Sequence, residues 1–121
     1  MTRFNITIKS GVDLVIFALR NAIGSEIFVP KLPSFKITDV VKCFQKKTNY
    51  KIIGIRPGEK MHEEMISSEE WLRTVEWENY LITSEYSNRG VFTVGWSYNS
   101  KDSLMDDDQT YNFLVNSGVI K

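Results

Sequence analysis

The sequence predicts an α/β protein, because two strand-like runs enclose a helical pattern. Residues 26–30 form a short apolar run that a proline closes, and residues 51–55 form a second apolar run. Between them, apolar residues recur at the i, i+3, i+4 and i+7 spacing of an amphipathic helix over about 36–47. These residues are Ile37, Val40, Val41 and Phe44. A strand, a helix and a strand within about 30 residues predict a βαβ unit with a right-handed crossover between parallel strands.

The first and last helices are predicted from their end signals. Ser10 and Asp13 resemble a capping box, and apolar residues at helical spacing continue toward Gly24, which predicts a helix over about 10–22. Near the other end of the chain, the three aspartates at 106–108 suit the positive end of a helix dipole. Gly118 suits the residue just past the end of that helix.

The middle of the chain predicts short elements of both kinds. Residues 61–66 predict a short helix, and Ser67 with Glu70 predicts a second capping box that opens a helix reaching about residue 75. Apolar runs at 80–83 and 91–94 predict two strands. Together with the βαβ unit, these elements predict a small mixed subdomain.

Length and composition predict a single globular domain over residues 1–121 that carries no global charge. Hydrophobic residues make up 42% of the chain, which is enough for a core. Fifteen basic and fifteen acidic side chains cancel, so we expect no nucleic-acid and no membrane partner. The single cysteine, Cys43, excludes an internal disulfide and suits a reducing cytoplasm.

Most catalytic and metal-binding patterns are missing from the sequence. The glycines never cluster into a phosphate-binding loop, and no tyrosine is followed four residues later by lysine. His62 lacks the second histidine of a zinc-binding helix, and residues 106–108 lack the spacing of a calcium loop. Three tryptophans have no basic groove between them, so we expect core packing rather than a stacking surface for Trp71, Trp77 and Trp96.

The most informative motif is the octet at residues 56–63, Arg-Pro-Gly-Glu-Lys-Met-His-Glu. A guanidinium at Arg56 suits phosphate oxygens, and a carboxylate at Glu59 suits sugar hydroxyls. The motif therefore indicates recognition of a nucleotide diphosphate, and the alternative is a plain surface ion pair. Arg3 is a second candidate for the same diphosphate, and the alternative for it is a frayed terminal residue.

Four segments, taken together, resemble a known enzyme family. They are Met1–Thr2–Arg3–Phe4 with Ile6–Thr7, residues 24–31 (Gly-Ser-Glu-Ile-Phe-Val-Pro-Lys), residues 51–66 around the octet, and Tyr98–Asn99–Ser100. In this order they resemble the C-terminal third of UDP-N-acetylglucosamine 4,6-dehydratases, above all the inverting enzymes of pseudaminic acid synthesis. Residues 1–83 carry the likeness most strongly, and residues 84–121 carry it more weakly.

The resemblance implies a partial extended short-chain dehydrogenase/reductase that binds a nucleotide sugar. It implies that Arg3 and Arg56 contact the diphosphate, that Glu59 approaches the ribose, and that Thr2 is a neighbour. It also implies that the family's NADP or NAD is bound by an N-terminal Rossmann part, together with the catalytic residues. That part has no counterpart here, so we expect this chain alone to bind no cofactor and to carry no catalytic residue. The strand at 26–30 would normally extend the Rossmann sheet.

Two interpretations follow from the resemblance. In the first, the chain is the substrate-binding portion of a UDP-N-acetylglucosamine 4,6-dehydratase in bacterial surface polysaccharide or nonulosonic acid biosynthesis. It would bind UDP-N-acetylglucosamine or a related UDP-sugar, and it would become part of a lyase when a Rossmann-domain half is supplied. In the second, it is a stand-alone, non-catalytic module for nucleotide-sugar binding or protein interaction. The resemblance also implies assembly as a homo-oligomer.

Overall fold

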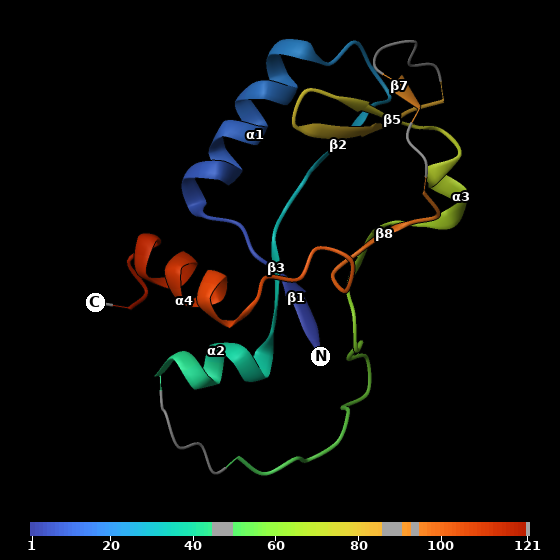
Figure 1. The fold of residues 1–121 in the computed structure, drawn as a ribbon. Helices are drawn as coiled ribbons and strands as arrows, with labels where there is room; N and C mark the ends of the chain where they lie inside the picture. The colour runs from blue at the N-terminus through green and yellow to red at the C-terminus, as the bar shows by residue number, and fades with distance from the viewer. Residues whose placement is uncertain (45–49, 86–90, 93–94, 121) are drawn as a thin grey trace. The chain divides into compact units, whose positions relative to one another are not determined.

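A computed structural model describes residues 1–44, 50–85, 91–92 and 95–120 of the chain (Figure 1). The chain divides into two compact units. Unit 1 comprises Met1–Asn5, Pro33–Glu63 and Ser100–Lys121, and unit 2 comprises Ile6–Leu32 and Glu64–Asn99. The α/β class is confirmed, whereas the single domain over residues 1–121 stays a prediction. None of the helices in the described ranges is long and apolar enough to span a bilayer.

Unit 1 contains a two-stranded antiparallel sheet and two helices. Strand β1 (Thr2–Phe4) pairs with β3 (Ser34–Lys36), with Arg3 opposite Phe35. Helix α2 (Ile37–Phe44) follows β3 directly, and α4 (Asp107–Asn116) packs against α2. Asp106 and Gln109 form the capping box of α4, and Gly118 follows its end with φ +75°, so both predicted ends of this helix are confirmed.

An ion-pair cluster joins the two helices of unit 1. The Lys42 ammonium lies 2.8 Å from Asp39 Oδ1 and 3.2 Å from Asp107 Oδ2. Hydrogen bonds to Asp39 and then to Asp107 raise the pKa of Lys42, so the lysine is charged at neutral pH. The neighbouring Cys43 is half-buried, and this burial raises the pKa of its thiol.

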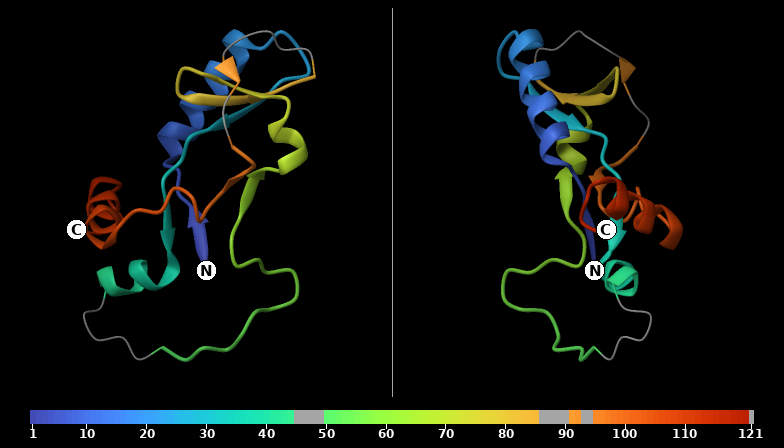
Figure 2. Two further views of the ribbon diagram at one scale, coloured as in Figure 1. Left: turned by 45° about the vertical axis from the view of Figure 1, so that its right-hand side comes forward. Right: turned by 90° about the vertical axis from the view of Figure 1, so that its left-hand side faces the viewer.

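Unit 2 is built on a four-stranded antiparallel sheet with one long helix beside it. The strand order is β2 (Ile27–Pro30), β6 (Tyr80–Thr83), β5 (Thr74–Trp77) and β7 (Val91–Phe92). Helix α1 (Ile8–Asn21) contacts β2 (Figure 2). A shorter pair, β4 (Glu64–Ile66) and β8 (Tyr98–Asn99), and the four-residue α3 (Ser68–Trp71) complete the unit.

The apolar core is concentrated in unit 2. Among the described residues, the buried hydrophobic ones in this unit are Val29, Ile66, Val75, Leu81, Ile82 and Tyr98, whereas unit 1 has Leu114. Several residues buried in unit 1 are instead polar, namely Thr2, Ser34, Asp39, Ser100 and Thr110. Hydrogen bonds of Thr2, Ser34, Asp39 and Ser100 therefore contribute to holding unit 1 together, because an unpaired buried polar atom is costly, whereas Thr110 Oγ1 has no hydrogen-bond partner among the described residues.

The predicted βαβ unit is wrong. Residues 51–55 form no strand, since they have no ladder partner in the described chain and Gly54 has φ +85°, outside the extended region. Strand β2 pairs antiparallel with β6 instead, because the hairpin of β5 and β6 offers it an edge. The predicted strand at 80–83 is confirmed as β6, and β2 is an outer strand of its sheet.

Several predicted helix boundaries also differ from the structure. Helix α1 begins earlier than expected, because Thr7 rather than Ser10 caps it by accepting from the Ser10 backbone N–H. Residues 64–66 form β4 instead of a helix, since β8 supplies their hydrogen bonds. The helix predicted over about 36–47 corresponds to α2, which begins at Ile37 where β3 ends. Residues 45–47 of the predicted helix lie outside the described part of the chain. The predicted strand at 91–94 is described only at its first two residues.

Two of the three tryptophans pack within unit 2. Trp77 lies 5.5 Å from Phe17 between ring centroids. The Trp71 ring lies against Gly95 so closely that a Cβ there would sit 2.6 Å from it, which explains the glycine. The prediction of core packing is wrong for Trp96, because 86% of its surface is exposed.

The core of unit 2 predicts a large difference between two apolar truncations. Ile82→Ala removes a fully buried side chain from β6 and should lower the free energy of unfolding by about 2–5 kcal/mol. Leu72→Ala removes an exposed side chain of the same size and should change it by less than about 0.5 kcal/mol. Urea unfolding measures both, and equal losses would contradict this assignment of the core.

The capping box of α3 makes a prediction about pH. The Ser67 backbone N–H and then its hydroxyl donate to the Glu70 carboxylate at 3.0 and 2.9 Å, and these bonds lower the pKa of Glu70. The resulting stabilisation is present above the pKa of the unfolded state and is lost as pH falls through the lowered folded pKa. Ser67→Ala should therefore raise the Glu70 pKa toward its ordinary value, as measured by NMR titration of the side-chain carboxyl. Ser68→Ala is the control and should leave the Glu70 pKa unchanged. An unchanged Glu70 pKa in Ser67→Ala would refute the assigned capping box.

Candidate functional site

The octet begins with a tight turn that its own sequence dictates. The Glu59 backbone N–H donates to the Arg56 carbonyl at 3.0 Å, and Gly58 has φ +84°. Proline followed by a glycine at positive φ is the pattern of a type II turn. The Glu59 carboxylate closes the turn by accepting from the Arg56 backbone N–H at 2.9 Å. Arg56 and Glu59 are therefore held three residues apart by backbone geometry.

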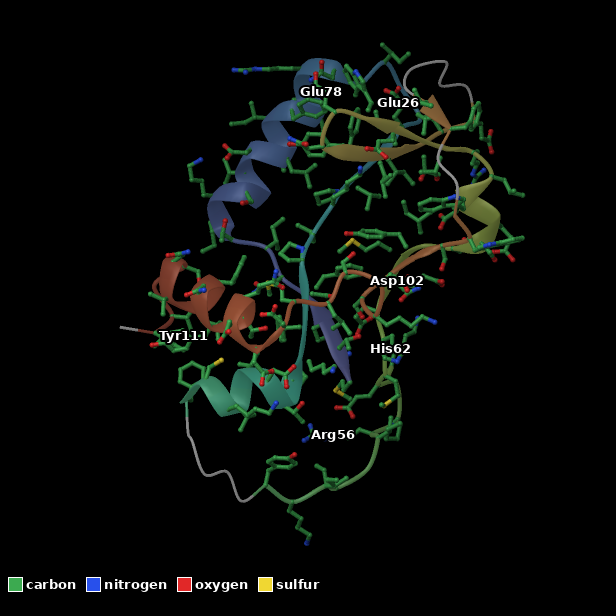
Figure 3. All side chains as sticks on the ribbon, viewed as in Figure 1. Glu26, Arg56, His62, Glu78, Asp102 and Tyr111 are labelled. Atoms are coloured by element: carbon green, nitrogen blue, oxygen red, sulfur yellow. The ribbon has the colours of Figure 1, made fainter. Side chains whose placement is uncertain are left out.

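The Arg56 side chain is presented to solvent. Its surface is 71% exposed, and its Nε lies 3.9 Å from Glu59 Oε1, a long and weak ion pair. Figure 3 labels Arg56 on the segment that leads to His62. Because little holds the guanidinium in place, it is available to an anionic ligand.

The Thr2 hydroxyl anchors this segment to β1. Thr2 Oγ1 lies 2.8 Å from His62 Nδ1 and 2.6 Å from Ser100 Oγ, and the Thr2 backbone N–H donates to the Met61 carbonyl at 2.8 Å. Ser100 Oγ also accepts from the Glu63 backbone N–H at 2.8 Å. Thr2 and Ser100 are both buried, and we call Thr2, His62 and Ser100 the hydroxyl junction.

Arg3 is fixed at the edge of the hydroxyl junction. Its Nη1 donates to the Thr2 carbonyl at 2.7 Å, and its Nε pairs with Glu63 Oε1 at 3.2 Å. The side chain is 26% exposed. These contacts engage Nε and Nη1, and a guanidinium has further N–H groups that can donate to a phosphate. Arg3 is thus an ordered residue rather than a frayed terminal one.

All four predicted site residues lie in unit 1. Thr2 and Arg3 come from β1, and Arg56 and Glu59 come from the turn. The Arg56 and Met61 Cα atoms are five residues apart in sequence, so at most about 17 Å separates them. Because the Met61 carbonyl accepts a hydrogen bond from the Thr2 backbone N–H, the turn is held near β1. Joint contact of Arg3 and Arg56 with one ligand stays a prediction.

The structure adds three residues that the motif analysis did not assign to the site. Glu63 orients Arg3, and His62 and Ser100 hold the Thr2 hydroxyl. Glu63 and His62 belong to the octet, so their place in the same motif as Arg56 could have marked them as site residues. Ser100 lies 98 residues from Thr2 and carries no local signal of its partner.

The arrangement suits recognition of an anion with sugar-like hydroxyl groups. One cation is exposed on a rigid turn, a second is held against a strand, and a carboxylate lies beside the first. A family model described as polysaccharide biosynthesis protein matches residues 1–85, which contain all four predicted residues. The chain belongs to this polysaccharide biosynthesis protein family. The predicted resemblance is thereby confirmed.

Individual relatives give the same result. The inverting UDP-N-acetylglucosamine 4,6-dehydratase of Campylobacter jejuni is 49% identical over 84 residues, which are 69% of this chain and 25% of that protein. An uncharacterized membrane protein of Methanocaldococcus jannaschii is 39% identical over 114 residues, covering 85% of this chain and 34% of that protein. The chain therefore spans between a quarter and about a third of the length of these relatives.

The fold is also found within a solved structure. The X-ray structure of Pen from Bacillus thuringiensis matches with a TM-score of 0.84 and 28% sequence identity. The match covers 100% of this chain and 39% of Pen. This family fold thus recurs with additional polypeptide in the same chain.

The hydroxyl junction predicts a specific cost for one substitution. Thr2→Val keeps the shape of the side chain but removes the hydroxyl, leaving His62 and Ser100 without that partner. We expect a loss of about 1–3 kcal/mol in the free energy of unfolding, because buried polar groups lose their hydrogen bonds. Thr2→Ser retains the hydroxyl and should lose less. Urea unfolding measures this, and a Thr2→Val variant as stable as wild type would contradict the role of the junction.

Proposed function

We propose that the chain is the substrate-binding portion of a UDP-N-acetylglucosamine 4,6-dehydratase and that it binds the UDP part of the substrate. The observation that supports this most directly is that the exposed Arg56 turn and the ordered Arg3 both belong to unit 1. The 49% identity to the Campylobacter jejuni dehydratase over 84 residues adds support, and so does the family match over residues 1–85, which contain both arginines. The role would be in sugar-nucleotide biosynthesis in the cytoplasm.

In this proposal the two guanidinium groups share the diphosphate. A diphosphate presents several negatively charged oxygens, and each arginine can donate to more than one of them. The ion pair of Arg3 with Glu63 fixes the guanidinium before the ligand arrives, which lowers the entropic cost of binding. Arg56 brings an exposed cation on a hydrogen-bonded turn, so its guanidinium is accessible to the second phosphate.

Glu59 and Thr2 have different parts in the proposed site. The Glu59 carboxylate lies beside Arg56 in the turn, and its oxygens can accept from ribose hydroxyls. The Thr2 hydroxyl is buried and already bonded to His62 and Ser100, so Thr2 acts by holding the octet near Arg3.

The chemical step would depend on polypeptide outside this chain. The residues present do not fit NAD or NADP, because the seven glycines never form a phosphate-binding loop. The chain's own contribution would be to bind and orient the nucleotide sugar, with a cofactor-binding Rossmann part as its partner.

The proposal makes a quantitative prediction for Arg56. Arg56→Ala should weaken UDP binding by about 10- to 100-fold, because a charge-assisted hydrogen bond contributes about 1.5–3 kcal/mol. Arg56→Lys keeps the charge but loses the planar fork, so it should weaken binding less. Calorimetric titration of UDP into the chain measures all three affinities.

A matched control separates a local effect from a change in net charge. Arg20→Ala removes another exposed arginine, which lies on α1 in unit 2, and should leave the UDP affinity unchanged. Equal affinities of wild type, Arg56→Ala and Arg56→Lys would refute the assigned role of Arg56. A chain that binds no UDP would refute the proposed function itself.

A further inference from the structure

Strands β1 and β3 place a cation and an aromatic ring side by side. Arg3 lies directly opposite Phe35 in the antiparallel ladder of these strands (Figure 1). Side chains that are directly opposite lie on the same face of a ladder, with Cβ atoms about 4.5–5.5 Å apart. Both residues are half-buried. The ordered arginine of the candidate site therefore has an aromatic neighbour on its own face of the ladder.

The other face of this ladder is covered by the segment that contains Ser100. Thr2 and Ser34 lie on that face, because successive residues of a strand alternate between its two faces. The Ser34 hydroxyl donates to the Ser100 carbonyl at 2.6 Å, and the Thr2 and Ser100 hydroxyl groups meet at 2.6 Å. Thr2 and Ser34 are consequently buried. Arg3 and Phe35 lie on the opposite face, and both keep part of their surface exposed.

Phe35 does not belong to a closed apolar core. Among the described residues of unit 1, Leu114 is the buried hydrophobic one, and Phe35 is half-buried. The alternative role for its ring is a cation–π contact with the neighbouring guanidinium. Arg3 is instead held by the Glu63 carboxylate at 3.2 Å and by the Thr2 carbonyl at 2.7 Å. These contacts fix the arginine without the ring, so the exposed part of the ring can take a ligand.

A cation beside an aromatic ring matches the two chemically different ends of a nucleoside diphosphate. The phosphates are anionic and suit arginine, whereas the base is a flat ring that stacks on aromatic side chains. A single ribose joins the two ends, so a protein that binds both must present a cation and an aromatic surface close together. Arg3 and Phe35 meet this requirement within one pair of strands.

We propose that Phe35 is the stacking surface for the base of the nucleotide, while Arg3 binds the diphosphate of the same molecule. This inference rests on the proposed function for the class of ligand. Every base has a π-face, so stacking on Phe35 adds affinity for the base without selecting one base over another.

Calorimetric titration of UDP and of ADP into the full chain tests the proposal. Phe35→Ala should weaken the binding of both nucleotides by about 5- to 100-fold, because stacking on one aromatic side chain contributes an affinity of that size. Phe44→Ala is the matched control, since it removes an aromatic side chain of α2 in the same unit that is 56% exposed, and it should bind UDP as wild type does. Inorganic pyrophosphate has no base, so wild type and Phe35→Ala should bind it equally.

NMR of bound UDP distinguishes stacking from a general loss of structure. Protons above the face of an aromatic ring are shielded, so the uracil H5 and H6 signals should move upfield when UDP binds to the wild-type chain. In Phe35→Leu saturated with UDP, the apolar side chain remains and the upfield shift should be lost. Unshifted uracil signals in the wild-type complex, or a shift that persists in Phe35→Leu, would overturn the inference. Equal losses of UDP and pyrophosphate affinity in Phe35→Ala would overturn it as well.

The variants at Phe35 and at Arg56 fail independently. UDP binding that depends on Arg56 but is unchanged in Phe35→Ala would reject the stacking surface and keep the proposed function. Binding that depends on Phe35 but is unchanged in Arg56→Ala would keep the stacking surface and reject the role of Arg56. A chain that binds neither UDP nor ADP would reject both.

Discussion

The hydroxyl groups of Thr2 and Ser100 meet at 2.6 Å in the interior of unit 1, and the rest of the candidate site depends on this contact. It joins the first strand, the octet and a segment near the other end of the chain. Leaving a buried hydroxyl group unsatisfied costs about 1–3 kcal/mol, and in this contact each of the two hydroxyl groups has a partner. The junction therefore specifies one arrangement of these segments in a unit that has little apolar core.

A polar interior suits a site that must bind a charged ligand. Four residues hold Arg3 and the octet in place. Thr2 hydrogen-bonds with His62 and Ser100, Ser100 accepts from the Glu63 backbone N–H, and the Glu63 carboxylate pairs with Arg3. Since the directions of hydrogen bonds are more specific than apolar contacts, the junction can place Arg3 accurately. The apolar residues of unit 2 serve a different purpose, because the buried ones pack its sheet and Phe17 of α1 stacks on Tyr80 of β6.

Local sequence signals predicted the structure correctly at two helix starts and at the turn of the octet, although the cap predicted for α1 at Ser10 was wrong. Asp106 and Gln109 cap α4, Ser67 and Glu70 cap α3, and the turn at Arg56 follows from Pro57 and Gly58. Local signals failed for residues 51–55, because a strand requires a partner and composition does not reveal whether one exists. The helix predicted at 61–66 was wrong at residues 64–66 for the converse reason. These residues form a strand because β8 supplies a partner about 34 residues away.

Long-range contacts account for what sequence reasoning missed in the site. Arg3, Arg56 and Glu59 were predicted from residue chemistry and from the family resemblance. Ser100 belongs to a segment that carries the family resemblance, but its contact with Thr2 could not be predicted, because the two residues are 98 positions apart. Glu63 was in the octet, yet only the fold brings its carboxylate to Arg3.

We propose that Arg3 and Arg56 bind one diphosphate together. NMR titration of the ¹⁵N-labelled wild-type chain with UDP, following the Nε–H signals of both arginines, tests this proposal most directly. We expect both signals to shift over the same range of UDP concentration, and uridine, which has no phosphate, should shift neither. Movement of only one signal, or of the two with different midpoints, would contradict it.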